Sequence, residues 1–136
     1  MLSHSSGNAS VINAALTLKD PRVKGIIFTG FANATADRFK LRLEDVPYPV
    51  ILIHHRDDNC TSFELARESQ KRFMKSPKVN FVEVMGGNNV LQVTCTPLDP
   101  SKGTSSAHIF SGKEREVIKV ATDWATEKQV PNRIDP

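Results

Sequence analysis

Apolar residues recur along the chain with two different spacings, one typical of helices and one typical of buried strands. Between Asn8 and Leu18 they fall three and four positions apart, which predicts a helix there. Three short apolar runs, at Val23–Thr29, Val50–His55 and Val79–Val84, predict strands. The apolar residues of the middle run are continuous rather than alternating, which is typical of a parallel strand covered on both faces.

Capping and breaking residues place two further helices. Thr61–Glu64 fits a capping box and predicts a helix that continues to about Met74, before Ser76-Pro77. Ser111–Glu114 fits a second capping box, and the helix predicted after it has a single apolar face. That face is formed by Val117, Val120, Ala121 and Trp124.

The remaining segments show weaker patterns. Residues 32–46 are ambiguous, a loop with a helical stretch around Ala36–Leu43, and residues 88–110 form a long loop. We expect 129–136 to be a flexible tail. The alternation of helices and strands predicts an α/β fold, with a parallel sheet of about three strands and flanking helices.

Composition narrows the function classes. The 136 residues suit one domain, and 39% of them are apolar. The net charge of +3 is carried by scattered Lys and Arg residues, with no basic stripe, so we expect no nucleic-acid partner. No run approaches the roughly 20 apolar residues of a membrane helix, so we expect no membrane partner. The first residues do not fit a signal peptide. We also expect no cofactor.

The first candidate for chemistry lies directly before the first helix. Ser3-His4-Ser5-Ser6-Gly7 nearly fits G-x-S-x-G, with Ser3 in the place of the first glycine. In that motif a sharp strand-to-helix turn presents the central serine, and the next backbone N–H helps to stabilise an oxyanion. The alternative is a serine-rich helix cap.

An acid and a histidine follow later in the chain. Asp57 and Asp58 come just after the strongest strand, where they are either turn formers or an acid that orients a histidine. His108 lies in the long loop before the last helix. His54 and His55 compete with it, but their place at a buried strand end favours a packing or supporting role.

These stretches together resemble the α/β-hydrolase family from its nucleophile turn onward, since that family has the chain order Ser…Asp…His. The resemblance implies that Ser5 is the nucleophile, His108 the general base and the Ser6 backbone N–H an oxyanion donor. In the family the acid comes three residues after the first position of the turn. His55 in that position, in place of the usual glycine, makes Asp58 the acid, with Asp57 as the alternative.

The resemblance also implies a partial fold. Residues 1–128 would be the C-terminal part of a hydrolase domain that lacks its N-terminal strands, including the strand that leads into Ser5. The expected activity is hydrolysis of a small ester-type acyl substrate. The alternative is an incomplete half that has no activity, or that binds a missing N-terminal half or a second copy through an open sheet edge.

The two cysteines and one metal hypothesis complete the candidates. Cys60 and Cys95 would be near each other in such a fold, and a disulfide there would favour an oxidising compartment. The alternative is two reduced, buried thiols. A metal site formed by His54, His55, Asp57 and Asp58 is disfavoured, because neighbouring strand residues point to opposite faces, so we expect no metal.

Overall fold

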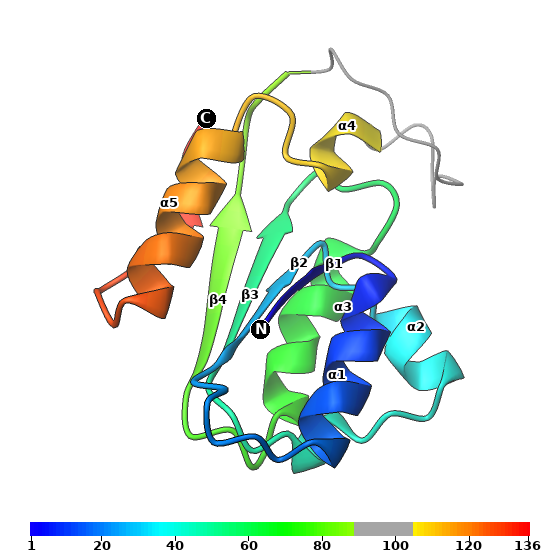
Figure 1. Cartoon of the computed structure of the whole chain (residues 1–136). Helices are drawn as coiled ribbons and strands as arrows, with labels where there is room; N and C mark the ends of the chain where they lie inside the picture. Colours follow the sequence, from blue (N-terminus) through cyan, green and yellow to red (C-terminus); the bar gives the residue numbers. More distant parts are fainter. Residues whose placement is uncertain (89–104) are drawn as a thin grey trace.

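Five parallel strands in sequential order form the centre of the structure (Figure 1). This computed structural model describes residues 1–88 and 105–136. The strands are β1 (Leu2–His4), β2 (Ile26–Thr29), β3 (Val50–His55), β4 (Val79–Val84) and β5 (Arg133–Ile134). Each strand pairs in parallel with the next, so the carboxyl ends of all five lie at one edge of the sheet.

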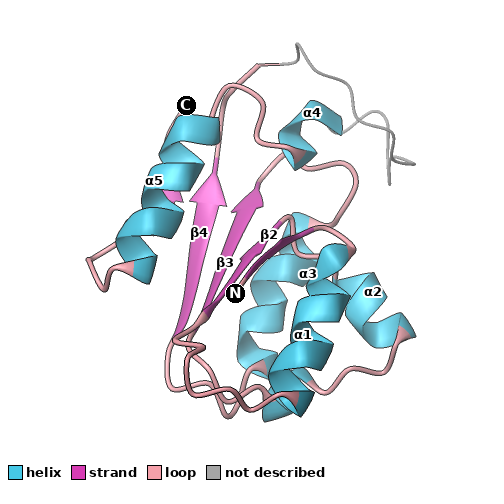
Figure 2. Cartoon of the chain, in the orientation of Figure 1, coloured by secondary structure: helices cyan, strands magenta, loops and turns pink. Residues whose placement is uncertain are grey.

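Helices cover both faces of this sheet (Figure 2). On one face lie α1 (Gly7–Thr17), α2 (Asn33–Arg38) and α3 (Phe63–Glu68), and on the other lies α5 (Glu114–Ala125). Two 3₁₀ turns, η1 (Leu43–Asp45) and η2 (Ser69–Arg72), and the short α4 (Ser105–His108) complete the elements. Among the described residues, no helix has the length and apolar character needed to cross a membrane.

The apolar core consists of two layers separated by the sheet. Leu52 of β3 packs with Ile12 of α1 in one layer, and its neighbour Ile53 packs with Val120 of α5 in the other. This follows from the geometry of a strand, in which successive side chains point to opposite faces. The continuous apolar sequence of β3 is therefore buried throughout, as the sequence predicted.

The strands predicted at Val50–His55 and Val79–Val84 are confirmed with the same bounds. The prediction of about three strands is wrong, because the sheet has two more short ones. Leu2–His4 forms the strand that was expected to be absent before Ser5. Arg133–Ile134 pairs with β4 inside the segment expected to be a flexible tail.

The two helices predicted from capping boxes begin later than expected. Ser62, not Thr61, is the N-cap of α3, and its hydroxyl accepts from the backbone N–H three residues on. Lys113, not Ser111, is the N-cap of α5, which begins at Glu114. The shift at Thr61 matters for the site, because the Thr61 hydroxyl does not cap the helix and instead donates to Asp58 Oδ2.

Candidate active site

Ser5 lies in a tight turn that joins β1 to α1 at the carboxyl end of the sheet. Its φ of +53° places a non-glycine residue in the left-handed region, which costs energy. The turn is held on both sides, since Ser5 N–H donates to Thr29 O at 3.0 Å and Asn8 N–H donates to Ser5 O at 3.0 Å. A strained strand-to-helix turn of this kind is the setting in which a nucleophilic serine is presented.

Asn8 stabilises this turn through its side chain, a role that was not predicted from the sequence. Its side chain is buried, and its Nδ2 atom donates to Ser3 Oγ at 2.9 Å. Its Oδ1 atom accepts from the backbone N–H of Ala32 at 3.3 Å. Asn8 thus ties β1 to the loop that follows β2, and its place on the inner face of α1 was the only signal in the sequence.

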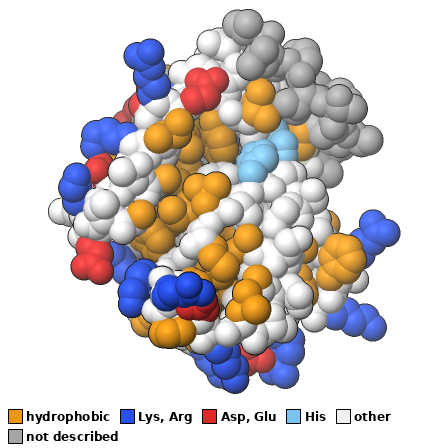
Figure 3. Space-filling model, viewed as in Figure 1, with side chains coloured by type: hydrophobic (Ala, Val, Ile, Leu, Met, Phe, Trp, Pro, Cys, Tyr) orange, Lys and Arg blue, Asp and Glu red, His pale blue; other side chains and the backbone are white. Residues whose placement is uncertain are grey.

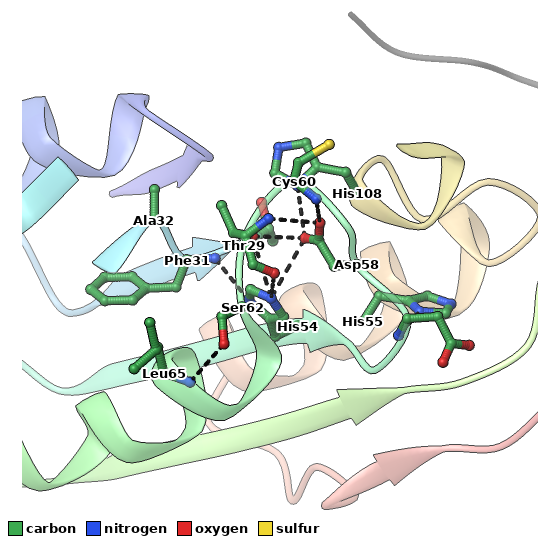
Figure 4. Close-up of polar contacts among 12 residues, drawn as sticks. Thr29, Phe31, Ala32, His54, His55, Asp58, Cys60, Ser62, Leu65 and His108 are labelled. Carbon is green, nitrogen blue, oxygen red and sulfur yellow. Dashed lines mark hydrogen bonds and ion pairs between the residues drawn. The ribbon is translucent and has the colours of Figure 1, made fainter. Parts of the chain in front are cut away.

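Asp58 lies in the turn after β3 and has both carboxylate oxygens occupied (Figure 4). Oδ1 accepts from the backbone N–H groups of Cys60 at 2.8 Å and Thr61 at 3.1 Å. Oδ2 accepts from Thr61 Oγ1 at 2.8 Å and lies 2.7 Å from His108 Nδ1. Four partners fill the roughly four acceptor positions of a carboxylate, so the orientation of Asp58 is fixed.

The charge of Asp58 is stabilised by these partners. Burial alone would raise the pKa of the carboxyl, but the hydrogen bond from His108 and the electrostatic attraction between the two side chains outweigh it and hold the pKa of Asp58 below its ordinary value. His54 and the Cys60 N–H act in the same direction. Asp58 is therefore an ionised carboxylate at neutral pH.

His108 meets Asp58 from α4, across 50 positions of sequence. Because its Nδ1–H is directed at a carboxylate, the neutral ring keeps Nε2 as a proton acceptor. The ring of His4, the residue before Ser5, lies 4.6 Å from the ring of His108, measured between centroids. Within the described residues no hydrogen bond joins Ser5 to His108, so the structure brings Asp58 and His108 together and places Ser5 next to a residue that contacts His108.

His4 is held neutral beside His108. Thr29 Oγ1 donates its only proton to Ser3 O at 3.1 Å, so its contact with His4 Nδ1 at 3.0 Å has His4 as the donor. Burial lowers the pKa of His4, and the nearby His108 lowers it further. A role for His4 was not predicted; its position beside Ser5 was the available signal.

The two histidines at the end of β3 point to opposite sides. His54 Nδ1 accepts from the Phe31 N–H at 3.0 Å, whereas His55 Nε2 lies 2.8 Å from Gly86 O. Both are buried and bound to backbone groups, as expected of supporting residues. Burial lowers the pKa of His54 to about 4. The metal site considered for this pair with Asp57 and Asp58 is not assembled, because the two imidazoles diverge (Figure 4).

A different trio has the ligand types of a metal site. Asp58, Cys60 and His108 each offer one ligand atom, and these atoms lie within 4.8 Å of one another. However, the carboxylate positions are filled by protein donors and His108 Nδ1 is turned to Asp58. We therefore assign no metal here. Cys95 lies outside the described residues, so its pairing with Cys60 stays a prediction.

The surface near the site combines histidine and apolar side chains. Figure 3 shows histidine side chains reaching the surface beside hydrophobic groups. Two cavities lined by described residues lie away from Ser5, one of about 670 Å³ at Phe81 and Arg133 and one of about 610 Å³ at Ile27 and Trp124. Neither contains Ser5, so neither identifies a substrate.

Comparison with known protein families, with curated proteins and with solved structures finds no match. Any functional proposal for this chain therefore rests on the site itself.

Proposed function

We propose that this protein is a serine hydrolase of the α/β-hydrolase type that cleaves small ester-type acyl substrates. The observation that carries the proposal is the buried hydrogen bond between His108 Nδ1 and Asp58 Oδ2. The His108 ring also contacts His4, the residue before the strained turn at Ser5. A carboxylate that fixes an imidazole through Nδ1 leaves Nε2 free to take a proton from a serine hydroxyl. Without substrate, the hydrogen bond between a catalytic serine and its histidine is often long or poorly aligned, and it tightens when substrate binds.

The proposed reaction has two halves. Ser5 Oγ attacks the carbonyl carbon while its proton passes to His108 Nε2, and the resulting oxyanion accepts a hydrogen bond from the Ser6 N–H. When the carbon–oxygen bond to the leaving group breaks, His108 returns the proton to the departing alcohol. Water then repeats the sequence on the acyl-serine, which releases the acid and restores Ser5.

The position of Ser6 supports its assigned role. Ser6 is the N-cap of α1, and the N–H groups at a helix start lack partners within the helix. The partial positive charge of the helix N-terminus favours the negative oxygen of the intermediate. Removal of one such donor costs on the order of 10²–10³ in rate in a characterised enzyme.

The matching test is hydrolysis of short-chain p-nitrophenyl esters by the wild type, Ser5→Ala and Ser6→Ala. Ser6→Ala is the control, because it removes a neighbouring hydroxyl but keeps the backbone N–H that the proposal uses. We expect turnover by the wild type and by Ser6→Ala, and none above background by Ser5→Ala. Equal rates for Ser5→Ala and the wild type would refute the assignment.

A second candidate function is binding through the outer edge of β1, which pairs with no strand of residues 1–88 and 105–136. Leu2 of this edge strand is 62% exposed, and an unpaired strand edge offers backbone groups to another chain. Leu2→Lys would then lower the apparent mass in gel filtration without unfolding the protein. An unchanged monomeric elution of both proteins over a range of concentrations would exclude self-association.

A further inference from the structure

His54 is a buried imidazole that the proposed reaction does not use. Its side chain has no exposed surface, and it lies on the same side of β3 as the acid turn. Both ring nitrogens have partners: Nδ1 faces the Phe31 N–H at 3.0 Å, and Nε2 lies 3.3 Å from Thr61 O and 3.4 Å from Thr61 Oγ1. A buried polar ring with every polar atom engaged is fixed in orientation.

The partners also determine which nitrogen of His54 carries the proton. Phe31 can only donate through its N–H, so Nδ1 of His54 is an acceptor without a proton. The proton of the neutral ring is therefore on Nε2, which donates to Thr61. A proton on Nδ1 would face the Phe31 N–H, so that two donors would oppose each other. Burial lowers the pKa of His54 to about 4, so the ring is neutral near pH 7.

Thr61 connects this ring to the acid. Its hydroxyl proton is donated to Asp58 Oδ2 at 2.8 Å, and its backbone N–H to Asp58 Oδ1 at 3.1 Å. Both oxygens of the acid are thus held by Thr61, and Thr61 is held by His54. His54 Nε2 itself lies 3.5 Å from Asp58 Oδ2, so loss of the ring would leave space directly beside the acid.

We propose that His54 is a positioning residue for Asp58: through Thr61 it anchors the acid turn to the loop after β2, so that Asp58 meets His108 in one fixed orientation. This deepens the hydrolase proposal and rests on it for its catalytic meaning. The chain of contacts runs from the Phe31 N–H through His54 and Thr61 to Asp58 Oδ2, the atom that binds His108 (Figure 4). His55, one position on, contacts Gly86 instead and is not part of it.

Two amide variants, His54→Asn and His54→Gln, each keep one of the two contacts of His54 and remove the other. An Asn amide can place its oxygen near Nδ1 and keep the Phe31 contact, but it cannot reach Thr61 as the Nε2–H does. A Gln amide can place its nitrogen near Nε2 and keep the Thr61 contact. If His54 acts through Thr61, His54→Asn weakens the site more than His54→Gln; if it is only an anchor in the core, the order is reversed or absent.

The primary measurement is the proton resonance of His108 Nδ1–H, which a hydrogen bond to a buried carboxylate shifts downfield. It needs no substrate, and it is read for the full-length protein at neutral pH. We expect the wild-type signal to persist in His54→Gln and to be lost or broadened in His54→Asn. The second measurement is the kcat for a p-nitrophenyl ester, which we expect to fall roughly ten- to hundredfold in His54→Asn with KM little changed.

Val46→Ala serves as the control for a general loss of stability. Val46 is fully buried, precedes β3 and lies far from the carboxyl ends of the strands. It should lower the melting temperature while the His108 resonance and kcat stay as in the wild type. A melting curve for each variant shows which ones are folded.

The outcomes separate the two proposals. A wild type without esterase activity, but with a His108 resonance that His54→Asn abolishes, would overturn the hydrolase assignment and support the role of His54. An active wild type whose resonance and kcat are the same in folded His54→Asn would overturn the role of His54 alone. Should His54→Asn not fold, Thr61→Val compared with Thr61→Ser decides, because only the latter keeps the hydroxyl that binds Asp58; equal signals in these two would also overturn it.

Discussion

The Nδ1 atom of His108 lies 2.7 Å from Oδ2 of Asp58, and the exposed fractions of the two side chains are 8% and 1%. Hydrogen bonds to an ionised carboxylate are stronger than neutral ones, and the low exposure keeps water from competing. This contact identifies Asp58, and not Asp57, as the partner of His108. Asp57 is exposed, whereas Asp58 is buried. The sequence had left this choice open.

Asp58→Asn tests that selection. The Asn amide has one oxygen to accept hydrogen bonds, and its NH₂ group would face N–H or O–H groups that now donate to Asp58. The hydrogen bond that orients His108 would therefore be lost. We expect ester hydrolysis to fall about 10⁴-fold, in line with the effect of the same change in a characterised triad. Asp57→Asn is the matched control and should retain nearly full activity; an equal loss in both variants would contradict the assignment of Asp58.

Gly30→Ala tests whether the space beside the two histidines is needed. Gly30 has a φ of +52°, and a Cβ there would lie 2.9 Å from His4 Cε1 and 3.1 Å from His108 Cε1. The left-handed backbone alone costs about 1–2 kcal/mol for an L-residue, and the contacts displace His108. We expect a lower unfolding free energy in urea titrations and a lower hydrolysis rate.

Gly7→Ala provides the comparison for Gly30. Gly7 begins α1, and a Cβ there would meet no atom within 4 Å. Alanine restricts the unfolded chain, so this variant should be as stable as the wild type or more stable by about 0.4–1 kcal/mol. If Gly30→Ala behaves like Gly7→Ala, the packing of His4 and His108 over Gly30 is not as described.

Strands whose own residues carry a hydrophobic pattern could be predicted from the sequence, and strands held only by pairing with a neighbour could not. The bounds of β3 could be read from the sequence because six consecutive residues are buried on both faces. β5 could not, because Arg133 and Ile134 carry no pattern of their own and are held by backbone bonds to β4, such as Met85 N–H to Ile134 O at 3.0 Å. β1 was missed for the same reason, since its three residues include Ser3 and His4.

The site shows the same division. The helix predicted from Asn8 and the near-match to G-x-S-x-G placed Ser5 in the turn before α1, and the position after β3 pointed to Asp57 and Asp58. A supporting role was predicted for His54 but not for Asn8, and the partners of both were missed, because each contact joins distant segments. Asn8 binds Ala32, and His54 binds Phe31, across 24 and 23 positions of sequence respectively.

Stability should depend on pH through His54. The pKa of about 4 in the folded protein lies below the ordinary 6.5, so between these values the unfolded chain binds more protons. The contribution of His54 is therefore complete above pH 6.5 and is lost as pH falls toward 4, a change of about 3 kcal/mol. His4, whose pKa burial also lowers, acts in the same direction.

Comparison with His54→Gln isolates this contribution. Urea unfolding at several values between pH 7 and pH 4 should give a steeper loss of stability for the wild type than for the variant, because only the wild type has an imidazole to protonate at this position. The lowered pKa of Asp58 affects stability mainly below its ordinary 3.8, outside this range. Parallel curves for the two proteins would contradict the buried, neutral state of His54.

A disulfide between Cys60 and Cys95 remains a prediction. Closure of a loop of that length would stabilise the protein by about 3–4 kcal/mol through the unfolded chain. We expect the intact mass without reductant to show that both thiol hydrogens are absent, and reduction to lower the melting temperature. Two thiols that react with a maleimide in the folded, unreduced protein would exclude the bond.

The central claim is that Ser5 is a nucleophile activated by His108 and Asp58, and a fluorophosphonate probe tests it most directly. Such probes form a covalent bond with an activated serine and do not require knowledge of the natural substrate. We predict one adduct on the folded wild type, mapped by peptide mass spectrometry to Ser5, and its loss in Ser5→Ala and in Asp58→Asn. A folded wild type that gives no adduct, or an adduct that maps to another serine, would contradict the claim.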